Sequence, residues 1–128
     1  MEAIVKRKPT ILVVDDDEDM LIIMQQKLIK EGYDPIFSPN GKNVMAIITQ
    51  RHPAIVLLDI TMDGVSGADL CKEIKHNPAT AAIPIVMYSA DENIEQVMKD
   101  CGADAYLKKP FGASNLKIVF NALLPAGI

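Results

Sequence analysis

Short runs of aliphatic residues alternate along the chain with longer amphipathic stretches. Three runs are continuous, which indicates strands covered on both faces, as in a parallel sheet; they are residues 11–14, 55–58 and 85–88. Two weaker strand candidates are residues 36–37 and 105–107. Apolar positions spaced i, i+3, i+4 and i+7 predict a helix after each strand; these stripes fall within residues 18–28, 44–48, 70–74, 94–101 and 116–123.

Five strands that alternate strictly with five helices predict an α/β fold. The pattern indicates a doubly wound parallel sheet with right-handed crossovers and helices on both faces. Pro35 lies in or just before the second strand, and a proline there predicts an edge position. Gly32 and Gly102 follow helical stripes, as glycines at helix C-termini do.

Composition fits one globular domain and excludes several function classes. The chain has 128 residues, of which 49% are hydrophobic and 23% charged. We assign residues 1–128 to a single domain, with a leading arm at 1–9 and a tail at 125–128. The net charge of −4 argues against nucleic-acid binding, and no apolar run is long enough to cross a membrane. Cys71 and Cys101 lack C-x-x-C spacing, so we expect buried free thiols in a reducing cytoplasm.

Polar residues suited to metal or phosphate chemistry follow each strong strand; they are Asp15, Asp16, Asp17, Asp59, Ser89, Lys108 and Lys109. Open α/β sheets bind ligands outside the carboxyl ends of their strands. Asp15, Asp16 and Asp59 therefore converge if the first and third strands are neighbours. Clustered carboxylates stay ionised only beside a cation, and oxygen ligands favour Mg²⁺, with Mn²⁺ or Ca²⁺ as substitutes. A lysine and a hydroxyl at the same edge would hold phosphoryl oxygens, which indicates phosphoryl transfer to a carboxylate.

Each of these residues also has a purely structural explanation. The acids after the first strand could favour a helix N-terminus through its dipole, which accounts for Asp17 and Asp19. Asp59 could stabilise a turn, and Ser89 could cap a helix that starts near Asp91. Coincidence at four strand ends is harder to explain in this way, so we favour a common site.

Four segments together resemble the receiver domain of two-component response regulators, including its chemotaxis members; they are residues 11–17, 56–62, 87–90 and 109–111. The resemblance covers essentially the whole chain in order and spacing. It implies a flavodoxin-like (βα)₅ fold with strand order 2-1-3-4-5. It also implies a phosphoacceptor signalling domain, which assists its own phosphoryl transfer and dephosphorylation but is not an enzyme.

The resemblance assigns a role to each residue of the expected site. Asp59 would be the phosphoacceptor, and Mg²⁺ would be held by Asp15, Asp16, Asp59 and the backbone carbonyl of Thr61. Lys109 and Ser89 would contact the phosphoryl group. Lys109 matches rather than Lys108 because it directly precedes Pro110, and the bond between them is implied to be cis.

Further positions are implied to control switching. Ser89 and Tyr106 would form the switch pair, with Tyr106 turning inward as Ser89 moves toward the phosphoryl group. Thr61 and Asp91 occupy positions that tune phosphoryl lifetime. The loop of residues 63–67 departs from the family, because Asp63 stands where proline is usual.

The implied partners are a histidine kinase or histidine phosphotransfer protein as donor, and an effector protein or attached output domain. The responding face would be helix four, strand five and helix five, about residues 94–124. The resemblance leaves a monomer or a phosphorylation-dependent dimer open. It implies a cytoplasmic location, with neither membrane nor direct nucleic-acid binding.

Two other functions are compatible with such a fold. One is a binding module that is never phosphorylated, although all acceptor, metal and phosphate-contact positions are filled. The other is a haloacid-dehalogenase-like aspartyl phosphatase, whose motif is D-x-D-x-T/V. Asp15 and Asp17 fit its acids, but Asp19 stands at the Thr/Val position, and Thr61 replaces the second acid after Asp59.

Overall fold

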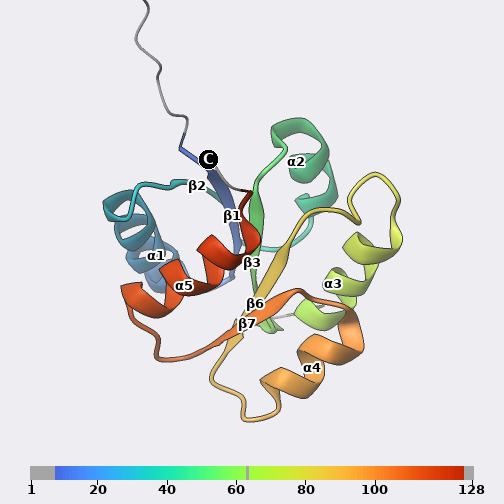
Figure 1. The fold of residues 1–128 in the computed structure, drawn as a ribbon. Coiled ribbons are helices and arrows are strands. Elements are labelled where there is room, and N and C mark those ends of the chain that lie inside the picture. Colours follow the sequence, from blue (N-terminus) through green and yellow to red (C-terminus); the bar gives the residue numbers. More distant parts are fainter. Residues whose placement is uncertain (1–7, 63, 126–128) are drawn as a thin grey trace, which may run out of the picture.

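The computed structural model describes residues 8–62 and 64–125. One parallel sheet has the order β2-β1-β3-β6-β7; its strands are β1 (Thr10–Val14), β2 (Asp34–Ser38), β3 (Ile55–Asp59), β6 (Ile85–Ser89) and β7 (Ala105–Lys108). Five helices lie within the described residues: α1 (Glu18–Lys30), α2 (Val44–Arg51), α3 (Gly67–His76), α4 (Ile94–Cys101) and α5 (Ala113–Leu123). Helices α1 and α5 cover one face of the sheet, and α2, α3 and α4 cover the other (Figure 1).

This architecture confirms the predicted doubly wound α/β fold and its strand order, since β6 and β7 are the fourth and fifth strands of the sheet. β2 is an edge strand, as Pro35 predicted, and among the described residues it pairs only with β1. An edge position suits proline because it has no N–H to donate to a second neighbour. The predicted leading arm and tail lie largely outside the described residues.

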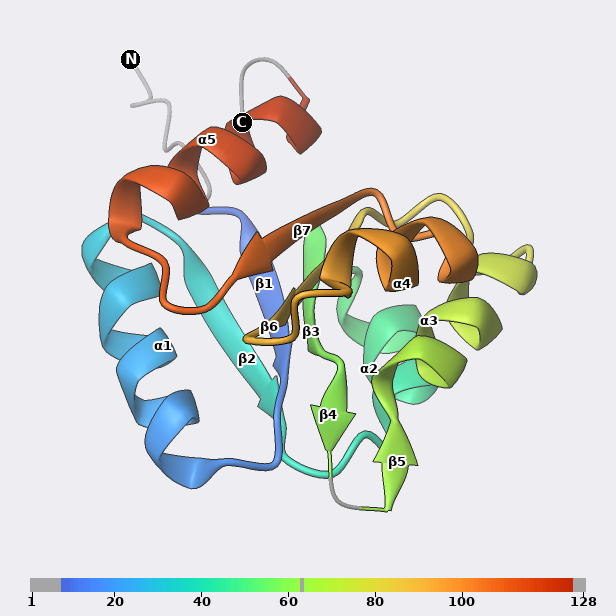
Figure 2. The same ribbon diagram turned by 90° about the horizontal axis from the view of Figure 1, so that it is seen from below.

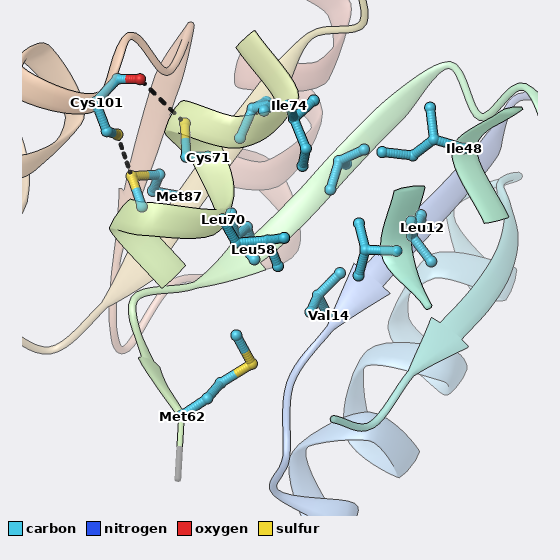
Figure 3. Close-up of a cluster of buried hydrophobic side chains, with 13 residues drawn as sticks. Leu12, Val14, Ile48, Leu58, Met62, Leu70, Cys71, Ile74, Met87 and Cys101 are labelled. Atoms are coloured by element: carbon cyan, nitrogen blue, oxygen red, sulfur yellow. Dashed lines mark hydrogen bonds between the residues drawn. The ribbon is translucent and has the colours of Figure 1, made fainter. Parts of the chain in front are cut away.

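Alternate side chains of the buried strands form two separate cores. One faces α2, α3 and α4 and includes Leu12, Leu58 and Met87 (Figure 3). The other faces α1 and α5 and includes Ile11, Leu57 and Tyr88. We call them the α3-side cluster and the α1-side cluster. Successive strand residues point to opposite faces, so a continuous aliphatic run supplies both.

Both cysteines are free and buried, as predicted, in the α3-side cluster. The Cys71 thiol donates to the Cys101 carbonyl oxygen at 3.5 Å, and the Cys101 sulfur lies 3.2 Å from that of Met87 (Figure 3). Burial raises the pKa of the Cys71 thiol well above its usual value. Such a thiol carries little thiolate and is chemically inert.

Helix ends follow the sequence signals with one exception. Asp17 caps α1 by accepting from the backbone N–H groups of Asp19 and Met20. Gly102 ends α4 in the left-handed conformation, with φ of 83°. α4 begins only at Ile94, so a helix starting near Asp91 was wrong; residues 92–93 form a turn before it.

The segment after β3 also differs from the expected loop. Thr61–Met62 forms β4, which pairs antiparallel with β5 (Val65–Ser66), and α3 begins at Gly67 (Figure 2). Asp63 lies outside the described residues. The hairpin was missed because two-residue strands are too short to give a periodic pattern.

None of the helices in residues 8–62 and 64–125 is long and apolar enough to cross a membrane.

Candidate functional site

The carboxyl ends of β1 and β3 bring three aspartates together. These strands are neighbours, with Val14 opposite Leu58, so the residues that follow lie side by side. Asp15 is fully buried, Asp59 is 6% exposed and Asp16 is exposed. One carboxylate oxygen from each lies within 4.8 Å of the others. The convergence expected from the parallel sheet is therefore present.

An open cavity of about 490 Å³ surrounds these carboxylates. Its lining includes the expected site residues from four strand ends; they are Asp15, Asp16, Asp59, Thr61, Ser89, Asp91 and Lys109. Asp17 lines it too, although its side chain caps α1. Tyr106 is not part of this lining.

Asp15 has protein donors on both carboxylate oxygens. Its Oδ1 accepts from the backbone N–H of Asp17 at 2.9 Å, and its Oδ2 accepts from the Tyr88 hydroxyl. Burial, and then the Asp15 carboxylate, raise the pKa of Tyr88 well above its usual value, so the phenol stays protonated and donates. These bonds matter because burying an ionised carboxylate without hydrogen-bond partners would strongly reduce the stability of the fold.

Asp59 lies between groups with opposing effects. Its Oδ1 accepts from the backbone N–H of Thr61 at 3.3 Å and lies 3.9 Å from Nζ of Lys109. Burial raises the pKa of Asp59 to about 6, with a further contribution from Asp15; Lys109 and the Thr61 N–H act in the opposite direction. The carboxylate is thus poorly stabilised in the absence of a cation, as expected for clustered acids.

The chain after β7 aims Lys109 at this cavity. The Lys109 backbone N–H donates to the Ser89 carbonyl oxygen at 2.8 Å, which fixes the end of β7 beside the end of β6. Its Nζ lies 4.7 Å from the centre of the Tyr88 ring. The Lys109–Pro110 peptide bond is cis. Lys108 is exposed and lines a different hollow, together with Tyr106.

The residues expected to control switching lie apart in this structure. Ser89 is buried at the cavity, and its Oγ accepts from the Asp91 backbone N–H at 3.0 Å. Tyr106 on β7 is 37% exposed and lines the hollow against α5. The Thr61 backbone is engaged through its N–H to Asp59, whereas its carbonyl remains a predicted metal ligand.

Sequence reasoning missed two residues that shape this site. Tyr88 was interpreted only as part of a strand, although a buried phenol needs a hydrogen-bond partner and so could have been flagged. Gly67 was treated as a loop glycine. A Cβ on it would lie 2.1 Å from the Asp59 carbonyl oxygen, so only glycine lets α3 begin against the acceptor strand.

The chain matches the family of the response regulator receiver domain over residues 11–121. It belongs to that family. It is 34% identical over 119 residues to the phosphate regulon transcriptional regulatory protein PhoB of Pseudomonas aeruginosa, covering 90% of this chain. It is 28% identical over 121 residues to histidine kinase P4 of Formosa agariphila, covering 93% of this chain.

Solved receiver structures share the fold closely. The chemotaxis protein CheY4 of Vibrio cholerae superposes with a TM-score of 0.83 at 22% identity, covering 92% of this chain and all of that one. By contrast, the chain spans 51% of the length of PhoB and 9% of the kinase. The chain therefore corresponds to the receiver, a signalling domain, within these longer proteins.

Proposed function

We propose that this receiver domain accepts a phosphoryl group on Asp59, with Mg²⁺ bound beside it, and thereby switches its contacts with a partner. The observation that carries the proposal is the cluster of Asp15, Asp16 and Asp59 oxygens within 4.8 Å, with Nζ of Lys109 at 3.9 Å from Asp59. Clustered carboxylates beside a cationic side chain suit transfer of an anionic phosphoryl group, because both charges must be neutralised at one place.

The residues present fit a magnesium ion. The ligand atoms that the structure brings together here are carboxylate oxygens of three aspartates, which lie within 4.8 Å of one another, and oxygen ligands favour Mg²⁺. Asp15, Asp16, Asp59 and the carbonyl of Thr61 would hold the ion, which would neutralise charge on the phosphoryl oxygens. Mn²⁺ or Ca²⁺ would satisfy the same ligands.

The chain's own residues would carry the transfer. An Asp59 carboxylate oxygen attacks phosphorus in line, forming the O–P bond as the P–N bond of a phosphohistidine breaks. The electron pair of that bond stays on the histidine nitrogen. Lys109 pairs with the phosphoryl oxygens, and the Ser89 hydroxyl donates to one of them. Hydrolysis of the acyl phosphate later resets the domain, at a rate tuned by Thr61 and Asp91.

The phosphoryl group would act on the face formed by α4, β7 and α5. Ser89 leaves its contact with the Asp91 N–H to reach the phosphoryl group, and Tyr106 turns inward into the space released. This is a shift between two populated states, biased by the new contacts. Tyr106 and Ile118 are exposed on this face, where an effector protein, an attached output domain or a second copy would bind.

We expect the donor to be a histidine kinase or a histidine phosphotransfer protein in the cytoplasm. Support comes from the relatives, which include a transcriptional regulatory protein and a histidine kinase. We treat residues 1–128 as one receiver domain. A binding module without phosphorylation would leave the close approach of Lys109 Nζ to Asp59 without a use.

The decisive experiment is intact mass spectrometry after incubation with acetyl phosphate, with Mg²⁺ or with EDTA. We expect one phosphoryl group on the wild-type chain with Mg²⁺ only, and none on Asp59→Asn. Asp34→Asn is the matched control, because Asp34 is exposed at the amino end of β2. The aspartate cavity lies at the other end of the sheet, where the strands have their carboxyl ends. Uptake by Asp59→Asn equal to that of the control would place the acceptor elsewhere.

A second comparison separates the two lysines. Lys109→Ala should slow uptake far more than Lys108→Ala, because only Lys109 lines the aspartate cavity. Equal effects would remove Lys109 from the proposed mechanism. Steady turnover of a phosphomonoester by the wild-type chain would favour the phosphatase alternative.

A further inference from the structure

Tyr88 touches both charged halves of the site although it is not one of the residues assigned to it. The side chain is fully buried on β6, directly opposite Asp59 on β3. Its hydroxyl donates to Asp15 Oδ2 at the end of β1. Because β3 lies between β1 and β6, the Tyr88 side chain reaches across β3 on the α1 side of the sheet. The face of the same ring lies 4.7 Å from Nζ of Lys109.

The hydroxyl has a clear effect on Asp15. With Oδ1 held by the Asp17 N–H and Oδ2 by Tyr88, the carboxylate has one orientation. Groups that hydrogen-bond to a metal-binding carboxylate fix its direction, and their loss typically weakens metal binding. Without the phenol, this buried carboxylate would turn more freely.

The ring has a separate effect on Lys109. A lysine side chain is flexible, and a cation over an aromatic face gains electrostatic attraction that limits its movement. The ring itself is fixed, because Phe111 packs edge-on against it with centroids 6.2 Å apart. Phe111 is in turn held by Lys27 of α1, whose Nζ donates to the Phe111 carbonyl oxygen at 3.2 Å.

We infer that Tyr88 is a positioning residue that presets the site through two separable contacts, orienting the Asp15 carboxylate by its hydroxyl and confining Lys109 by its ring. The inference rests on the proposed Mg²⁺-dependent phosphorylation and deepens it. One side chain of the α1-side cluster would thus hold both a metal ligand, Asp15, and the phosphate-binding cation, Lys109, in place.

The hydroxyl is tested by Mg²⁺ affinity, which does not depend on turnover. Isothermal titration of wild type, Tyr88→Phe and the control Tyr33→Phe measures it directly; the chain has no tryptophan for a fluorescence titration. Tyr33 is another buried tyrosine of the same cluster, packed on Phe120. We expect Tyr88→Phe to weaken Mg²⁺ binding about tenfold and Tyr33→Phe to bind like wild type. Affinities within twofold for all three would overturn the role of the hydroxyl.

The ring is tested by the phosphorylation rate at saturating Mg²⁺, where the affinity defect is masked. Tyr88→Phe keeps the ring and should react within about twofold of wild type, whereas Tyr88→Leu should be slower by about three- to tenfold. Phe thus rescues what Leu loses, and circular dichroism confirms that both variants fold. If folded Tyr88→Leu reacts as fast as Tyr88→Phe, or if Phe is as slow as Leu, the ring does not confine Lys109.

These outcomes are distinct from failure of the proposed function. If wild type neither binds Mg²⁺ nor takes up a phosphoryl group, the proposed function and this inference fall together. If wild type does both and Tyr88→Phe matches it in Mg²⁺ affinity, only the inference about the hydroxyl is wrong.

Discussion

The two clusters on either side of the sheet use the same strands but meet the site differently. The α1-side cluster ends in aromatic and cationic groups, with Tyr88 reaching Asp15 and Phe111 held by Lys27. The α3-side cluster contains sulfur contacts among Cys71, Cys101 and Met87, none of which lines the aspartate cavity. One side of the core is therefore coupled to the chemistry through side chains, whereas the other chiefly stabilises the fold.

The largest expected effect tests the stabilising side. Ile74 is fully buried in the α3-side cluster (Figure 3), so Ile74→Ala should lower the free energy of unfolding by about 2–5 kcal/mol. Urea unfolding measures the loss. Mg²⁺ affinity and phosphorylation of the folded variant should stay within about twofold of wild type, since the side chain contributes to packing alone.

Ile74→Val, which removes one methyl group, is the milder control and should lower the free energy of unfolding by about 0.5–1.5 kcal/mol. A large loss of Mg²⁺ affinity would show that both sides are coupled to the site.

An intermediate effect tests the charge of the Asp59 carboxylate, at the end of the strand that contributes to both clusters. The pKa of Asp59 is about 6 in the folded, metal-free protein, against an ordinary value of 3.8. Between these pH values the folded state binds more protons than the unfolded state, so stability falls as pH rises and stays low above about pH 6. Asp59→Asn removes this loss and should be more stable than wild type by about 1–3 kcal/mol at pH 8.

Thermal unfolding in EDTA at several pH values measures that difference. It should fall to a small remainder near pH 4, where Asp59 is protonated in the folded state and roughly half protonated in the unfolded state. Saturating Mg²⁺ should also reduce it at pH 8, because the bound cation stabilises the wild-type fold. A difference that stays constant from pH 4 to pH 8 would contradict the raised pKa.

The smallest effect concerns the contact by which Lys27 of α1 holds Phe111 in the α1-side cluster. Lys27→Met keeps the aliphatic stem but removes the hydrogen bond to the Phe111 carbonyl oxygen and the charge 5.2 Å from its ring. We expect a loss of about 0.5–1.5 kcal/mol in urea unfolding. Lys30→Met, at an exposed position of the same helix, is the control. Equal losses in the two variants would mean that Lys27 does not support Phe111.

The sequence predicted the site residues that a general rule of sheet topology places. In a parallel sheet, residues that follow neighbouring strands lie close together. Asp15, Asp16 and Asp59 could be brought together because neighbouring parallel strands end at one edge. The direct placement of Lys109 before Pro110 distinguished it from Lys108. The roles of these residues in phosphorylation stay predictions, because the positions of the side chains do not by themselves demonstrate a reaction.

Three further features were missed, each for a different physical reason. Tyr88 reaches Asp15 past an intervening strand, so neither residue's neighbours indicate the bond. Gly67 is needed because the start of α3 approaches the Asp59 backbone closely, and the residue pattern does not show how the chain turns between them. The β4–β5 hairpin has two-residue strands, below the length at which alternation is visible.

The buried thiols have a practical consequence for watching the molecule at work. Cys71 and Cys101 are the two cysteines of the chain, and both are enclosed in the α3-side cluster. A maleimide dye would therefore leave the native protein unlabelled. A cysteine introduced at Ile118, 69% exposed on α5, would take a single probe without removal of the native pair. That probe would report directly on the face expected to respond to phosphorylation.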